Sequence, residues 1–200
     1  LLLFLIISFL ISGFIVKSLN VDFLINTVLI GSAFYLFFNT LRDLIIRKFD
    51  NVSQNVTHFG FSLLILSILL NNVFSSEIIT NMKIGETFQS KDFNLQFKNI
   101  EKKSGKNFES IIGNFNIKNS NGIIEVLRPE LRIYNQPNIV TSEADIKTNL
   151  ISDKFVTMNY VQNQDYFNIR YQVKPFMIWI WISVILISSG GLLSLFRKNR

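Results

Sequence analysis

Long apolar runs separated by polar segments constrain this chain more than any other feature. Apolar residues fill 1–39, 56–74 and 175–196, and they thin out between 77 and 174. About 20 predominantly apolar residues are enough for a helix to cross a bilayer. We therefore predict a membrane protein with about four transmembrane α-helices and a small extracytoplasmic antiparallel β domain inserted before the last helix.

Charges and turns set the expected boundaries. The chain begins at Leu1 inside an apolar stretch, so we expect the C-terminal part of a larger protein. Residues 1–38 should form two transmembrane helices, the first truncated at its start. The other expected segments are a cytoplasmic loop or interfacial helix over 39–55, a transmembrane helix over 56–75 carrying His58, an extracytoplasmic β-rich domain over 76–174, a C-terminal transmembrane helix over 175–197 and a basic cytoplasmic tail over 197–200.

The net charge of +6 can be explained by basic residues that flank the predicted membrane spans. Basic residues outside the polar segment gather mainly in two clusters beside apolar runs, as the positive-inside rule describes. These residues are Lys17, Arg42, Arg47, Lys48, Arg197, Lys198 and Arg200. The excess charge then requires no nucleic acid as a partner. The rule places 76–174 on the periplasmic side and the C-terminus in the cytoplasm, and the bias toward Ile, Asn, Lys and Phe favours a bacterial inner membrane.

The sequence lacks the residues that several kinds of catalysis and metal binding require. The chain has no cysteine, so it forms no disulfide and no thiolate metal site. It carries no Walker loop, no dinucleotide glycine pattern, no HExxH motif and no serine–histidine–acid arrangement. We therefore predict no catalytic residue within these 200 residues.

The central segment has the alternation of β-strands. Phe93, Leu95 and Phe97 alternate with polar residues, and so do Phe115 and Ile117. A turn-forming stretch at 119–122 (NSNG) separates these from Ile124 and Val126, which predicts a hairpin. Residues 141–150 are the one stretch expected to form a short helix, because a Thr or Ser could cap its start. The expected fold is an antiparallel sandwich or open barrel.

His58 is the only histidine and the leading candidate ligand. It stands at the head of an apolar run, where an ionisable side chain is costly and is by default treated as functional. A neutral imidazole is a good axial ligand for haem iron. A b-type haem held between two helices would need a second axial His from outside these residues. The alternative is a structural His that bonds to lipid headgroups or to a neighbouring helix.

Two further groups of residues have both a structural and a functional interpretation. Lys174, Pro175, Trp179 and Trp181 are typical of a chain re-entering a membrane, with a proline in the first helical turn and interfacial indoles. They could alternatively form an aromatic floor for a porphyrin. Arg132 could pair across a strand with Glu130 or face a haem propionate, although alternating charges on a strand usually mark a solvated face.

Short motifs in order along the chain resemble the C-terminal part of the CcmF family, the haem lyase subunit of system I cytochrome c maturation, within the CcmF/CcsA-type biogenesis proteins. The matching stretches are 58–60 (HFG), 82–87 (MKIGET), 128–134 (RPELRIY), 141–146 (TSEADI), 171–176 (YQVKPF), 179–181 (WIW) and 190–192 (GGL). The resemblance covers about residues 50 to 197. Between Lys83 and Arg128 only the β character supports it.

The resemblance implies a specific function. Members of this family take haem, their substrate, from the haem chaperone CcmE and attach it to apocytochrome c, which CcmH-type subunits help to present. They also hold a structural haem b, and the family's transmembrane histidine ligand falls on His58. The family's tryptophan-rich haem-handling segment, its flanking histidines and its other haem ligand lie upstream of the matching region. Trp179 and Trp181 are not that segment. The fragment would be part of a lyase complex and not catalytic alone.

Two other functions stay open on the residues themselves. The first is a membrane-anchored extracytoplasmic scaffold or sensor in which His58 has a structural role. The second is a cytochrome b-like electron-transfer module without covalent assembly chemistry. Membrane lipid is an expected partner in every case.

Overall fold

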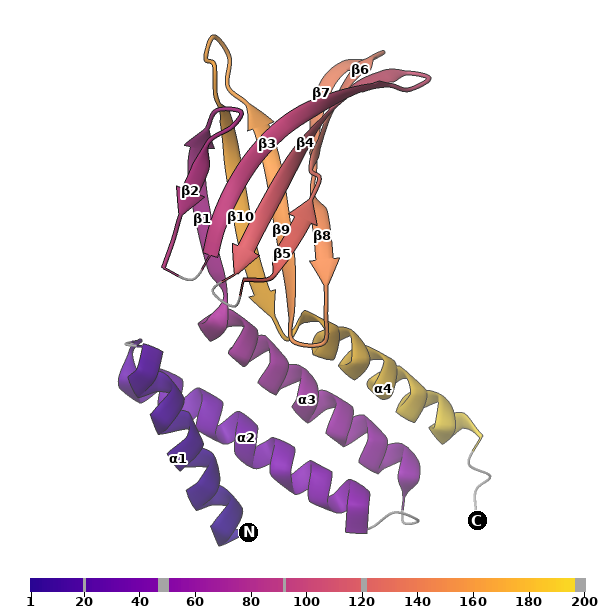
Figure 1. Ribbon diagram of the computed structural model, residues 1–200. Helices are drawn as coiled ribbons and strands as arrows, with labels where there is room; N and C mark the ends of the chain where they lie inside the picture. Colours follow the sequence, from indigo (N-terminus) through magenta and orange to yellow (C-terminus); the bar gives the residue numbers. More distant parts are fainter. Residues whose placement is uncertain (20, 47–50, 92, 120–121, 197–200) are drawn as a thin grey trace. The chain divides into compact units, whose positions relative to one another are not determined.

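A computed structural model describes residues 1–19, 21–46, 51–91, 93–119 and 122–196. The chain divides into two compact units (Figure 1). The helical unit comprises Leu1–Ser75, Asn149–Ser152 and Lys174–Arg200, and the β unit comprises Ser76–Thr148 and Asp153–Val173. Arg47, Lys48 and the basic tail at 197–200 lie outside the described residues.

The helical unit contains α1 (Leu2–Leu19), α2 (Phe23–Ile46), α3 (Val52–Phe74) and α4 (Met177–Leu195). All four are long and apolar enough to cross a membrane. The helix α2 runs past the expected boundary at residue 38, because Leu41, Leu44 and Ile45 continue a helical spacing. Much of the segment expected as a loop or interfacial helix over 39–55 is therefore the end of α2 and the start of α3.

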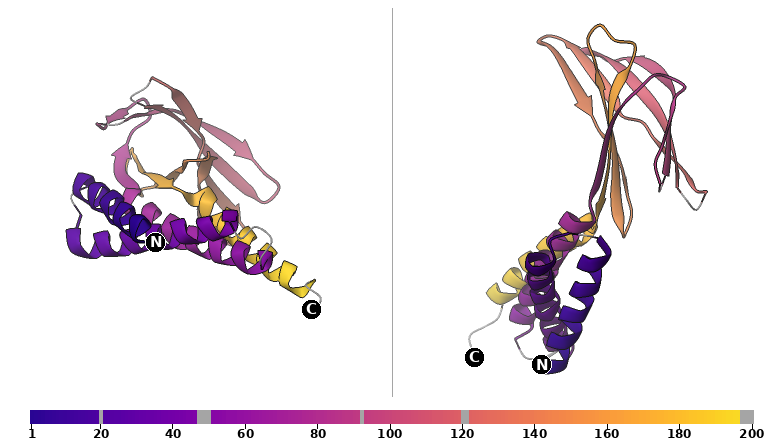
Figure 2. Two further views of the ribbon diagram at one scale, coloured as in Figure 1. Left: turned by 90° about the horizontal axis from the view of Figure 1, so that it is seen from below. Right: turned by 90° about the vertical axis from the view of Figure 1, so that its left-hand side faces the viewer.

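Successive helices in the chain lie against one another (Figure 2). Hydroxyl-bearing side chains form hydrogen bonds between them. The Ser12 hydroxyl of α1 donates to the Thr27 carbonyl of α2 at 2.8 Å. The hydroxyls of Thr40 and Ser62 join α2 to α3 at 2.6 Å. Such contacts hold helices in lipid, where burial of apolar side chains against one another gives little driving force.

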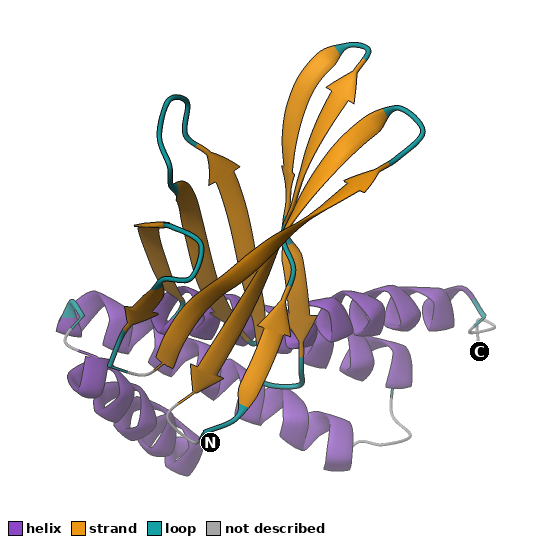
Figure 3. Ribbon diagram, turned by 45° about the horizontal axis from the view of Figure 1, so that its top comes forward, coloured by secondary structure: helices purple, strands orange, loops and turns teal. Residues whose placement is uncertain are grey.

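The β unit contains two antiparallel sheets. Figure 3 draws their strands in orange. One sheet has the strand order β1-β10-β9-β8 and the other β2-β3-β4-β6-β7, with β5 paired to β4. The strands are β1 (Ser76–Met82), β2 (Thr87–Gln89), β3 (Phe93–Ser104), β4 (Phe108–Asn119), β5 (Ile124–Leu127), β6 (Glu130–Asn135), β7 (Asn138–Glu143), β8 (Asp145–Thr148), β9 (Ser152–Tyr160) and β10 (Phe167–Pro175).

Both sheets contribute side chains to one core, which makes the unit a sandwich. Phe97 on β3 and Phe115 on β4 are fully buried and stack with ring centroids 4.4 Å apart. Met158 on β9 and Ile169 on β10 complete the core from the other sheet. The predicted fold class, four apolar helices with an antiparallel β domain between the third and the fourth, is confirmed.

The predicted hairpin after Phe115 is confirmed, but Ile124 and Val126 on its second strand face solvent and not the core. In the register of β4 and β5, Phe115 lies opposite Leu127 and Ile117 opposite Glu125. Leu127 is therefore buried while Ile124 and Val126 are exposed. Glu125 points inward to a 2.6 Å ion pair with Lys154. Burial, with a smaller contribution from Glu125, raises the pKa of Tyr171 to about 12.

The helix predicted over 141–150 is wrong. This stretch ends β7, forms β8 and enters the turn before β9. Ser142 lies opposite Leu131 on β6, and Ile146 lies opposite Phe155 on β9. Pairing with the neighbouring strands β6 and β9 in two hairpins outweighs the local capping preference, because each paired residue satisfies its backbone groups in a ladder.

Candidate functional site

The helix α3 presents His58 on a side that no described helix covers. A second side packs on α4, where the Ser53 hydroxyl donates to the Gly190 carbonyl at 2.7 Å. A third side packs on α2, where the rings of Phe37 and Phe59 lie 5.6 Å apart. Residues three or four apart share a helix face, and the side left open carries Gln54, His58, Phe61 and Ile68, all exposed.

Two glycines allow α3 and α4 to pack closely against each other. A Cβ added at Gly60 would lie 3.0 Å from the Ile187 backbone nitrogen, and one added at Gly190 would lie 2.9 Å from the Thr57 backbone nitrogen. Larger residues at either position would push α3 and α4 apart. Because Thr57 and Gly60 face α4, the intervening His58 is turned away from it.

The surroundings of His58 fit one axial ligand of a haem. The imidazole is exposed, and the structure shows no hydrogen-bond partner for it among the described residues. Phe61, 54% exposed, and Ile68, 48% exposed, continue the same side as an apolar surface. A flat apolar macrocycle could lie against such a surface with its iron at the imidazole. Within the described residues no group of three or more His, Cys, Asp or Glu could hold a different metal.

Lys174, Pro175 and the two tryptophans surround the start of α4. Pro175 is the last residue of β10 and α4 begins at Met177, so the proline precedes the helix and is not in its first turn. The Pro175 carbonyl accepts a 2.5 Å hydrogen bond from the Asn71 amide of α3. The Trp179 indole donates to the Leu150 carbonyl at 2.9 Å, whereas Trp181 is exposed. The sequence did not predict either bond, because the partners are far apart along the chain.

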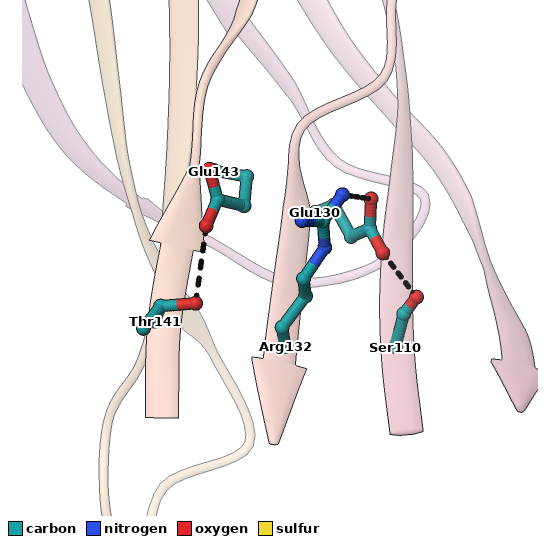
Figure 4. A network of polar contacts seen from close by, with 5 residues as sticks. All are labelled: Ser110, Glu130, Arg132, Thr141 and Glu143. Carbon is teal, nitrogen blue, oxygen red and sulfur yellow. Dashed lines mark hydrogen bonds and ion pairs between the residues drawn. The ribbon is translucent and has the colours of Figure 1, made fainter. Parts of the chain in front are cut away.

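Arg132 belongs to a polar network on the β unit (Figure 4). It bonds to Glu130 at 3.1 Å along its own strand, so the predicted pair does not cross between strands. Ser110 on β4 donates to the same carboxylate, and the Arg132 guanidinium lies 5.2 Å from the centre of the Phe108 ring. The hydrogen bond from Arg132 is the main reason that the pKa of Glu130 lies below its ordinary value.

Comparison with known proteins assigns a family to this arrangement. The profile of the CcmF C-terminal beta-sandwich matches residues 73–175, slightly more than half of the chain. The chain belongs to this family. The matched region runs from the end of α3 through all ten strands to the residue before Phe176.

Full-length relatives extend the likeness beyond the sandwich. The cytochrome c-type biogenesis protein CcmF of Pseudomonas aeruginosa is 26% identical over 141 residues, covering 70% of this chain and 22% of the relative. The protein of the same name from Escherichia coli is 25% identical over 139 residues, covering 70% and 22%. The chain thus spans about a fifth of the length of these relatives.

A solved structure shares the fold. The protein described as cytochrome c heme lyase CcmF superposes with a TM-score of 0.69 at 15% sequence identity, covering 96% of this chain and 33% of its own. The four apolar helices and the sandwich therefore both occur in a known fold. Together with the family match, the four apolar helices support a multi-pass membrane protein.

Proposed function

We propose that this chain is the C-terminal part of a haem lyase that receives haem from the chaperone CcmE and attaches it to apocytochrome c with the help of CcmH-type subunits. The family match supports this proposal, and so do the names of the relatives. The observation that carries it at the level of residues is the exposed imidazole of His58 on the open side of α3.

His58 would hold a structural haem b as one of its two axial ligands, and the second His would come from outside these residues. Phe61 and Ile68 would lie against the macrocycle and exclude water from that side of α3. The packing of Ser53, Thr57 and Gly60 against α4 would hold the backbone of α3, and hence the imidazole, at a fixed rotation about the helix axis. A haem bound in this way supplies one-electron redox chemistry, with a potential set by axial ligation and burial.

The β unit would lie in the periplasm, as residues 76–174, and the C-terminus in the cytoplasm of a bacterial inner membrane. Arg42 in α2 and the Lys and Arg residues near the chain's C-terminal end favour this orientation. A periplasm-active reporter fused at Asn119 should be active, and one fused after Arg200 should be inactive. The reverse pattern would overturn the orientation.

The decisive experiment compares His58→Ala with wild type in the full-length protein. We expect the reduced-minus-oxidised optical spectrum of the variant to lose the b-type signal and holocytochrome c formation to stop, while membrane insertion is unchanged. Gln54→Ala is the matched control, because Gln54 lies one turn earlier on the same exposed side of α3. It should keep both the spectrum and the activity.

Each other outcome has a definite meaning. A full haem spectrum in His58→Ala would exclude His58 as a ligand. Loss of the spectrum in both variants would indicate a general disturbance of α3. A wild-type protein without any haem signal would favour the non-catalytic scaffold or sensor, and a haem signal without any effect on cytochrome c assembly would favour a cytochrome b-like module.

A further inference from the structure

The turn between β8 and β9, at Asn149–Ser152, is grouped with the helices and not with the sandwich. Two of its residues, Leu150 and Ile151, are large and apolar, yet they are 67% and 71% exposed. An exposed apolar pair at the tip of a hairpin is unfavourable in water. The position of this turn relative to α4 indicates what covers the side chains of Leu150 and Ile151.

Hydrogen bonds hold the turn in one conformation. The Asn149 side-chain oxygen accepts from the backbone nitrogens of Ile151 and Ser152, each at 2.8 Å. The Asn149 backbone nitrogen in turn donates to the Ser152 carbonyl at 3.1 Å. This is the local bonding by which an asparagine stabilises a tight turn. The apolar pair is therefore presented on a defined backbone.

Two further hydrogen bonds tie the turn to the start of α4. The Ile151 carbonyl accepts from the Phe176 backbone nitrogen at 2.8 Å, and the Leu150 carbonyl accepts from the Trp179 indole at 2.9 Å. Figure 1 shows the β8–β9 turn beside the first turn of α4. Both bonds use backbone carbonyls of the turn, so the side chains of Leu150 and Ile151 remain free to contact something else.

The start of α4 marks the edge of the membrane-spanning region. The end of α3 lies at the same level, because Asn71 bonds to the Pro175 carbonyl and the rings of Phe74 and Phe176 lie 6.3 Å apart. Polar residues follow α3 at once and precede α4, at Ser75–Glu77 and at Lys174. Trp179 and Trp181 occupy this level, where indoles favour the boundary between lipid and water.

We propose that Leu150 and Ile151 insert into the interfacial layer of the lipid bilayer, so that the β8–β9 turn is a membrane-contacting element in addition to the four helices. Trp181 and Ile185, one turn apart on the candidate span α4, are likewise large, apolar and exposed, as expected of side chains that face lipid. This proposal is independent of haem binding at His58.

The absence of cysteine from these 200 residues allows a direct test by spin labelling. Leu150→Cys and Ile151→Cys are made one at a time in the full-length protein, on a background without other accessible cysteines. Each is labelled with a nitroxide and reconstituted in vesicles of phosphatidylethanolamine and phosphatidylglycerol. The collision rates of the nitroxide with oxygen, which enriches in lipid, and with a water-soluble nickel complex are then compared. Gln162→Cys, an exposed position in the turn between β9 and β10, is the matched control.

We expect the oxygen-to-nickel ratio at residues 150 and 151 to be several-fold higher than at residue 162. A ratio equal to that of the control would place the turn in water and overturn the proposal. Low collision rates with both reagents would show that another protein segment covers the pair, which would also overturn it. The two labelled positions check each other, and their backbone carbonyl bonds do not depend on the substituted side chains.

Discussion

The helical unit and the sandwich differ in the mix of residues that they bury. In the helices the fully buried positions are often serines, such as Ser12, Ser62 and Ser183, while large apolar side chains such as Phe14 are exposed. In the sandwich the fully buried positions are large and apolar, including Phe97, Phe115 and Met158. The same chain therefore follows two different rules for its interior.

The difference follows from the two solvents. Lipid tails are as apolar as a leucine side chain, so helices gain little by burying apolar groups against each other, and close approach and hydrogen bonds hold them together. A sandwich outside the spans gains free energy from every apolar group removed from water. Hydrophobicity consequently identifies the core of the sandwich, but it does not separate the inner from the outer surface of the helices, where Ile30 is buried and Phe14 is exposed.

The largest effect that we predict is at the centre of the sandwich. Phe97→Ala should lower the free energy of unfolding of the β unit by about 3–5 kcal/mol, because it removes a fully buried ring and leaves a cavity. Hydrogen exchange of the β3 and β4 amides in the nanodisc-embedded protein would measure this. Phe14→Ala, at a position 77% exposed on α1, should leave the exchange of α1 unchanged. Equal losses at both positions would remove the contrast between the units.

An intermediate effect is expected where α3 meets α4. Gly190→Ala should destabilise their packing by about 1–3 kcal/mol, the usual cost of overpacking, because its Cβ would collide with Thr57. Gly191→Ala is the adjacent control, since a Cβ there meets nothing within 4 Å. Thermal unfolding in detergent, monitored by circular dichroism, would compare the stabilities of the two variants. A neutral Gly190→Ala would show that small residues do not set the distance between these helices.

The smallest effect concerns charge on the sandwich. The folded pKa of Glu130 lies below its ordinary value of 4.5, chiefly through its hydrogen bond from Arg132. Its contribution to stability is therefore present above pH 4.5 and is lost as the pH falls through the folded pKa. Glu130→Gln should cost less than about 1 kcal/mol at neutral pH, as for exposed ion pairs. Denaturation at several pH values should show that the difference from wild type disappears in acid, and a constant difference would contradict this assignment.

Much of this architecture could be predicted from local patterns. Apolar runs predicted the four helices, since a span must be apolar along its whole length. The alternation around Phe97 and Phe115, with the turn at 119–122, predicted β3, β4 and β5. The motifs from His58 onward indicated the family. His58 was identified as a candidate ligand because a lone histidine in such a helix is unusual.

Other features depended on which segments pack against each other in the folded chain. The sequence by itself determined which segments are helices and that the middle is β-rich, because these depend on composition and period within short windows. Only the tertiary structure decided that 141–150 pairs as strands, that Glu125 and not Val126 points inward, and that Trp179 bonds to Leu150. The physical reason is that strand pairing, strand register and the bond between a turn and a helix are set by tertiary packing, which a local pattern does not specify.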